Sequence, residues 1–270
     1  MEVLQREDWQ ARAASHAARI DAYVAPHLAR REARVRHPVH DFLFTYYSFR
    51  PAQLRRWHPG YGVGLADAPE YDALNGYDAG TVSEAHLVDR LRLLRQLRNL
   101  MTATAGRSPH LGCFGLHEWA MVYRQTADQL RHNAWPLRLG SAATDEVVER
   151  HRVVCSHFDA YRFFTEPARP LNVLAPGRDD RADFEQPGCL HAGMDLYKHA
   201  FRLSPLVSSD LVADCFELAW EIRTMDMRAA PYDLTDLGFD PIRIETPTAS
   251  RSTWRSSAGS PSAARCCASG

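Results

Sequence analysis

The chain has 270 residues, of which 45% are apolar and 24% are charged, and its formal net charge at pH 7 is −1. This length suits one large domain or two small ones, and the composition is typical of a globular protein rather than a disordered or membrane chain. No uncharged apolar stretch approaches the roughly 18 residues that a bilayer crossing needs, and the charged N-terminus lacks the apolar core of a secretory signal. We therefore expect a cytoplasmic protein with no membrane partner. A charge near zero also excludes a whole-molecule field that attracts nucleic acid.

The basic residues are almost all arginine, since Lys198 is the only lysine among 32 basic residues. Two interpretations stay open: a coding bias toward arginine, or selection of arginine for phosphate contacts through its bidentate fork. The first four cysteines stand singly and far apart, with no C-x-x-C pair. This pattern argues against a thiolate zinc site and indicates buried thiols.

The first half of the chain predicts three helices and one long loop. Apolar residues recur every three or four positions over residues 5–34, which predicts a long helix that Pro26 bends. A second helix is expected from His37 to Arg50, before Pro51. Residues 57–80 hold five glycines and two prolines and predict a long ordered loop. The strongest helical pattern begins at Ser83-Glu84 and carries a leucine stripe.

The second half predicts shorter elements followed by two helices. Residues 115–125 favour a short helix, and alternating stretches within 137–166 favour two strands that flank a helix. A loop rich in proline, glycine and aspartate covers 167–188, and helices are expected near 189–203 and 206–228.

Neither a repeat nor a linker divides these elements. The sequence therefore predicts a mainly α fold: a single helical domain over residues 1–247 with a small β element. Residues 248–270 contain seven serines, no acidic residue and no periodicity, which predicts a disordered tail.

Histidines and carboxylates are concentrated in three of the expected helical segments. His37 and Asp41 are four apart on one expected helix face, as are His191 and Asp195. His117 and Glu118 are adjacent, so we expect them to point about 100° apart and not to share a small ligand. We expect the three segments to line a common pocket, because unpaired burial of these groups is costly. They are either hydrogen-bonded structural pairs or ligands of a metal held by His37, Asp41, His117, His157 and His191.

Carboxylates also occur among apolar residues, where burial raises the pKa of an acid. Asp214 and Glu217, which precede Arg223, Asp226 and Arg228, have the spacing of an ion-pair network. Glu118 and Asp195 are the better candidates for an acid or base. Lys198 follows Asp195 by three residues, and it is either a nucleophile or an accident of the arginine bias.

The aromatic side chains are also concentrated, and most of them are expected to form the core. Stacking of an extruded base is the functional alternative. The candidates for binding a substrate are Tyr46, Tyr47, Trp57, Trp119, Tyr123 and Lys198.

Four segments resemble an actinobacterial protein family labelled 3-methyladenine DNA glycosylase, which is not of the helix-hairpin-helix type. They are HPVHDFLFTYYSFRPAQLRRWHPG (37–60), CFGLHEWAMVYR (113–124), QPGCLHAGMDLYK (186–198) and LVADCFELAWEIRTMDMRAAPYDL (211–234), and the resemblance covers about residues 35 to 246. It implies a DNA-repair hydrolase that cuts the N-glycosidic bond of alkylated purines in DNA and needs no cofactor, because methylation already activates the leaving base.

The family label transfers no catalytic residue, so the site is inferred from this sequence. A glycosylase needs a carboxylate that faces the sugar, as in glycoside cleavage. Our candidates are Glu118, near Trp119, and Asp195, which His191 holds from one turn earlier, with His117 as a further catalytic group. Two other classes stay open: a helical metal- or cofactor-dependent enzyme that uses the histidines, and a non-enzymatic binding protein. The sequence does not indicate an oligomeric state.

Overall fold

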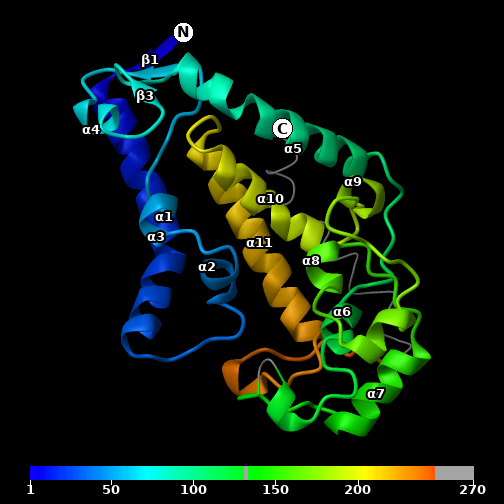
Figure 1. Cartoon of the computed structure of the whole chain (residues 1–270). Helices are drawn as coiled ribbons and strands as arrows, with labels where there is room; N and C mark the ends of the chain where they lie inside the picture. Colours follow the sequence, from blue (N-terminus) through cyan, green and yellow to red (C-terminus); the bar gives the residue numbers. More distant parts are fainter. Residues whose placement is uncertain (131–132, 247–270) are drawn as a thin grey trace. The chain divides into compact units, whose positions relative to one another are not determined.

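The computed structural model describes residues 1–130 and 133–246, and most of them are helical (Figure 1). The prediction of a mainly α fold with a small β element is confirmed. The chain forms two compact units: of the described residues, unit 1 contains Met1–Arg98 and Asp195–Trp220, and unit 2 contains Asn99–Met194 and 221–246. The single domain over 1–247 stays a prediction, and the predicted disordered tail (248–270) lies outside the described residues. Within the described ranges, none of the helices has the length and apolar character that a bilayer crossing requires.

Unit 1 begins with the long helix α1 (Arg6–Glu32), which confirms the helix predicted over 5–34. Its buried side chains lie three, four or seven residues apart, which is the spacing of one helix face. They are Trp9, His16, Ile20, Val24 and His27.

The helix predicted from His37 to Arg50 is wrong at its beginning and its end. Only α2 (Phe42–Tyr46) is helical there, and α3 (Pro51–Leu54) follows as a separate helix. The side chains before α2 take up backbone donors: His37 Nδ1 accepts hydrogen bonds from the amides of Val39 and His40, and Asp41 Oδ2 accepts one from the amide of His37. Such local bonds compete with helix formation, so 37–41 are turns.

The predicted loop 57–80 contains two of the four strands among the described residues. β1 (Glu2–Leu4) pairs in parallel with β2 (Val63–Leu65), and β3 (Tyr77–Asp78) pairs antiparallel with β4 (Thr81–Val82). The helix α4 (Pro69–Asp72) lies between them in sequence, and β1, β3 and α4 lie at the N-terminal end of α1 (Figure 1). Their core contains Leu4, Trp9, Trp57, Leu65, Tyr71 and Tyr77.

Three long helices each contain residues of both units. α5 (Glu84–Ala105) begins where predicted, and the Ser83 hydroxyl accepts a hydrogen bond from the amide of His86 at 3.2 Å. α10 (Leu190–Leu203) and α11 (Ser209–Ala229) confirm the two helices predicted near 189–203 and 206–228.

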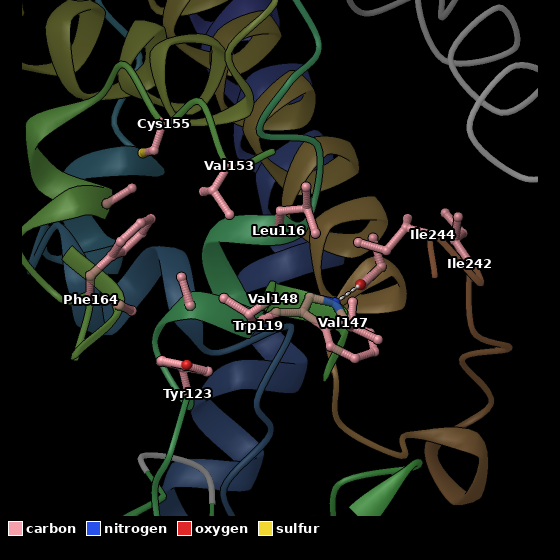
Figure 2. Packing of buried hydrophobic residues seen from close by; sticks show 14 residues of the cluster. Leu116, Trp119, Tyr123, Val147, Val148, Val153, Cys155, Phe164, Ile242 and Ile244 are labelled. Atoms are coloured by element: carbon pink, nitrogen blue, oxygen red, sulfur yellow. Dashed lines mark hydrogen bonds between the residues drawn. The ribbon is translucent and has the colours of Figure 1, made fainter. Parts of the chain in front are cut away.

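Unit 2 is built around Trp119 of α6 (Leu116–Ala120), whose indole Nε1 donates a hydrogen bond to the Ala229 carbonyl at 2.9 Å (Figure 2). Val147 and Val148 of α7 (Gly140–Arg150) pack in the same cluster. The remaining elements are short: η1 (Ala127–Gln129), α8 (Phe158–Tyr161), η2 (Glu166–Leu171), α9 (Arg181–Phe184) and η3 (Thr235–Leu237).

The strands predicted on either side of α7 are wrong. Only isolated bridges occur there, Leu137 with Tyr232 and Val153 with Asn172. Next to the second bridge, the Asn172 side chain accepts from the amide of Cys155 at 2.6 Å and donates to its carbonyl at 2.9 Å. A side-chain amide therefore takes the place of the neighbouring strand that the alternating pattern predicted.

Candidate metal centre

The short helix α6 brings two ionisable residues, His117 and Glu118, into the interior of unit 2. Its N-cap, Gly115, has φ +69°, and a Cβ at this position would lie 2.7 Å from the Cβ of Ala229. Only glycine combines this backbone conformation with so close an approach. The missing side chain therefore allows α6 to pack against the C-terminal end of α11.

His117, Glu118 and Asp226 meet at one point. One ligand atom from each residue, an imidazole nitrogen or a carboxylate oxygen, lies within 4.8 Å of the other two. Their exposed fractions are 1%, 6% and 0%. His117 and Glu118 were expected to point apart, yet a ligand atom of each lies within 4.8 Å of the other, and the Glu118 carboxylate pairs with Arg223 at 2.8 Å.

The hydrogen bonding of His117 leaves one ring nitrogen for a ligand. Nδ1 lies 3.0 Å from the carbonyl oxygen of Cys113, which only accepts hydrogen bonds, so Nδ1 carries a proton. Nε2 then faces Asp226 Oδ1 at 2.9 Å. Among the described residues, neither of these two buried atoms completes a hydrogen bond of acceptable geometry. A backbone carbonyl that fixes the tautomer of an imidazole is the usual support of a metal-binding histidine.

Two buried carboxylates share one guanidinium at the centre. Arg223 Nη1 lies 2.8 Å from Glu118 Oε1 and 3.4 Å from Asp226 Oδ2, so one guanidinium serves two carboxylates. Burial lowers the pKa of His117, but the charges of Asp226 and then Glu118 outweigh burial and raise this pKa to about 9. A proton on His117 is thus stabilised by the two carboxylates, and the same charges would stabilise a bound cation.

Two further predicted residues belong to the same neighbourhood. The ring of His191 lies edge-on to that of His117 with 4.5 Å between centroids, and the ring of His157 lies 5.5 Å from that of His191. His157 Nε2 is 3.3 Å from Glu185 Oε1. All are buried. The structure thus places the rings of His157 and His191 near His117 and Glu118, and a joint role of the histidines as metal ligands stays a prediction.

The other candidate carboxylates belong to unit 1 and are engaged there. Asp195 forms an ion pair with Lys198 and accepts a hydrogen bond from the Tyr47 hydroxyl at 3.0 Å. Asp41 pairs with Arg30 at 2.6 Å and with His27 at 2.9 Å. The common pocket for the segments at 37–41, 117–118 and 191–195 stays a prediction, because they belong to two units.

The candidate aromatic residues mostly pack against other side chains. Trp57, Trp119 and Tyr123 are buried, whereas Tyr46 and Tyr47 are half-buried and contact the rings of Phe42 and Phe49. A role for them in binding a substrate stays a prediction.

The sequence did not identify Asp226 as a ligand. The expected ion-pair network is confirmed for Asp214 and Glu217, which both contact Arg19 at 2.6 Å. Asp226 was expected in the same network, and it does pair with Arg223, at 3.4 Å, but it also faces His117 of α6. Its position between Met225 and Met227 was the available signal.

No family model, curated protein or solved structure matches the chain. The geometry of the centre is therefore the basis of the functional argument.

Proposed function

We propose that this protein is a metal-dependent enzyme whose divalent cation is bound by His117, Glu118 and Asp226. The observation that carries the proposal is the convergence of one imidazole and two carboxylates at a buried point. Burial of charged groups costs free energy that well-packed apolar residues would not, so a cluster of this kind is more often kept for function than for stability.

The ligand set indicates which cations fit. Carboxylate oxygens suit Mg²⁺ and Mn²⁺, and imidazole nitrogen suits Zn²⁺ and Fe²⁺, so a mixed set favours Mn²⁺, Fe²⁺ or Zn²⁺. Three protein ligands leave a coordination position for water or substrate, which is typical of catalytic rather than structural sites. A cation held there would polarise a substrate oxygen or lower the pKa of bound water. Arg223 contacts both carboxylates and holds them in place.

The alternative function is a metal-free glycosylase with Glu118 or Asp195 as its carboxylate, and this alternative is less well supported than the metal centre. Glu118 is paired with Arg223, and Asp195 is paired with Lys198. Both are buried, with exposed fractions of 6% and 2%. A carboxylate that stabilises a sugar cation acts alone, whereas the convergence of His117, Glu118 and Asp226 offers three ligand atoms to one cation. Release of 3-methyladenine from DNA stays a prediction of the resemblance.

Metal binding by the full-length protein tests the proposal. Protein stripped with a chelator is dialysed against Mn²⁺, Zn²⁺ or, without oxygen, Fe²⁺, and its metal content is measured. We expect about one ion per chain, and an affinity loss of at least about tenfold in His117→Gln and Asp226→Asn. His151→Gln and Asp145→Asn are matched controls, because both residues lie on or next to α7 in unit 2 and contact backbone atoms, those of Val147 and Arg124, outside the proposed centre. Equal metal content in all variants would overturn the proposal.

An activity assay then separates the two enzyme classes. Methylated duplex DNA is incubated with metal-loaded and with chelator-stripped protein, and free methyladenine is measured. Release by loaded protein alone assigns the glycosylase reaction to the metal centre. Release by stripped protein, lost in Glu118→Gln or Asp195→Asn, would replace our proposal with the metal-free mechanism.

A further inference from the structure

Unit 1 contains a cavity of about 210 Å³ whose wall carries two positively charged side chains. Two arginines and two histidines line it, Arg56, Arg90, His58 and His86, together with the amides Gln53 and Asn75. Among the described residues, no carboxylate belongs to its wall. The cavity belongs to unit 1 alone and is distinct from the candidate metal centre in unit 2.

Arg56 and Arg90 differ from the arginines that stabilise this unit. Arg19 and Arg30 contact carboxylates at 2.6 Å, whereas neither Arg56 nor Arg90 forms an ion pair within the part of the chain that the structure describes. Two guanidinium groups beside one cavity repel each other unless an anion lies between them. Their forked donors match the oxygens of a phosphate or carboxylate.

His86 adds a buried polar group without a partner. Its side chain is 8% exposed, and Nε2 makes no hydrogen bond among the described residues. The ring is fixed against Gly76, where an added Cβ would lie 2.9 Å from Cγ and Nδ1 of the imidazole. A buried polar atom without a hydrogen bond costs free energy, and an oxygen of a ligand in the cavity would remove that cost.

The position of His86 in α5 strengthens the attraction for anions. His86 and Arg90 lie one turn apart at the beginning of this helix, whose N-terminus carries partial positive charge. The other histidine of the cavity wall, His58, is held in place by Tyr77: its Nδ1 lies 2.9 Å from the Tyr77 hydroxyl.

We propose that this cavity binds the phosphate group of a small phosphate monoester. A phosphate monoester carries about −1.5 to −2 charges near pH 7, which matches two guanidinium groups better than a carboxylate does. The volume lies below the roughly 300–1,000 Å³ of pockets for drug-sized ligands, so the organic part is small. Leu74 and Phe201 supply an apolar wall for it.

Calorimetry on the full-length protein tests this inference. The protein is stripped of metal first, so that phosphate bound to a cation in unit 2 contributes no heat. The probes are phenyl phosphate, benzoate as the carboxylate of similar shape, and dimethyl phosphate as the diester unit of a nucleic-acid backbone. We expect phenyl phosphate to bind most tightly.

Three variants and a control locate the binding. We expect Arg90→Gln and Arg56→Gln each to weaken phenyl phosphate binding about tenfold or more, which corresponds to the loss of a charge-assisted hydrogen bond. His86→Gln should weaken it several-fold. Arg92→Gln is the matched control, because Arg92 is an exposed arginine of α5 that does not line the cavity. Urea midpoints establish that each variant is folded. Absence of binding to the unaltered protein, equal affinity for all three probes, or an equal loss in Arg92→Gln would overturn the inference.

Discussion

Arg223 is the residue on which the stability of the candidate metal centre depends most. It is 2% exposed and is the guanidinium that contacts both Glu118 and Asp226. Removal of one partner from a buried ion pair leaves uncompensated charge in the interior, which costs about 3–5 kcal/mol. We expect Arg223→Met to lower the free energy of unfolding of metal-free protein by about that amount, measured by urea denaturation.

The ion pair between Arg124 and Glu149 lies at the surface, and it serves as the control for the buried ion pairs of Arg223. Its side chains are 60% and 47% exposed, so solvent already screens their attraction. Arg124→Met should leave the urea midpoint nearly unchanged. A loss in Arg223→Met as small as that in Arg124→Met would show that the buried carboxylates do not depend on the guanidinium.

His37 links the stability of unit 1 to pH. Burial, aided by the charges of His40 and Arg30, lowers its pKa from 6.5 to about 4. The unfolded chain therefore binds a proton near pH 6.5 that the folded chain does not bind until about pH 4. The stabilising effect is complete above pH 6.5 and is lost as the pH falls toward 4. Protonation would also break the hydrogen bonds that Nδ1 accepts from the amides of Val39 and His40.

The variant His37→Gln should reduce this pH dependence without abolishing it. The pKa values of His40 and His58 are also lowered, mainly by burial, so they contribute in the same direction. Urea midpoints at pH 7 and pH 5 measure the effect: the midpoint of the unaltered protein should fall further than that of the variant. An equal fall of the midpoint in both proteins would show that the pKa of His37 is the same in the folded and the unfolded chain.

At the scale of elements, the packing of α6 depends on the glycine that precedes it. A side chain at Gly115 would meet the Cβ of Ala229 at 2.7 Å and would also have to adopt φ +69°. Gly238 has a similar φ of +82°, but no atom lies within 4 Å of its added Cβ. The two positions therefore separate the cost of the backbone conformation from the cost of the contact.

We expect Gly115→Ala to destabilise the protein by about 1–3 kcal/mol more than Gly238→Ala, since overpacking adds to the strain that both substitutions share. Urea denaturation of the two variants measures the difference. Metal affinity should fall in Gly115→Ala only, because α6 carries two of the proposed ligands. Equal stability losses would show that α6 and α11 separate at little cost.

The long helices were predictable because each carries its own evidence in its sequence. The apolar periodicity of α1 and α5 and the proline and serine residues between α10 and α11 specify those elements locally. The short strands β1 and β2 were not predictable, because three residues carry no recognisable period and their pairing joins residues about 60 apart. The helix expected from His37 did not begin there, because the side chains of His37 and Asp41 accept hydrogen bonds from nearby backbone amides. The apolar pattern of the sequence does not reveal such bonds.

The candidate metal centre was predictable only in part. Histidines 117, 157 and 191 and Glu118 were recognisable as polar residues in apolar segments, which is a local property. The contact of Asp226 with His117 joins residues more than 100 positions apart, and only the packing of α6 on α11 specifies it. The sequence therefore indicated that histidine and carboxylate ligands were available, but it did not indicate that Asp226 joins His117 and Glu118.

At the scale of the whole molecule, the near balance of 32 basic and 33 acidic residues is reflected in specific pairs. Arg19, Arg30, Arg138 and Arg223 each contact at least one carboxylate. Arg56 and Arg90 instead line a cavity and form no ion pair among the described residues.

The C-terminal boundary of the folded protein can be tested by shortening the chain. Ile242 and Ile244 are buried in the core of unit 2 (Figure 2), and Glu245 forms an ion pair with Arg138 at 2.6 Å. Residues 248–270 contain no acidic residue and no apolar periodicity, so we expect them to contribute little. A chain that ends at Thr248 should keep the thermal midpoint of the full chain within the ~2–4 °C that corresponds to 1 kcal/mol. A chain that ends at Gly238 should lose far more, because it lacks both isoleucines and the partner of Arg138. Calorimetry of the three chains measures both effects, and a large decrease in the chain that ends at Thr248 would show that the last segment stabilises the fold.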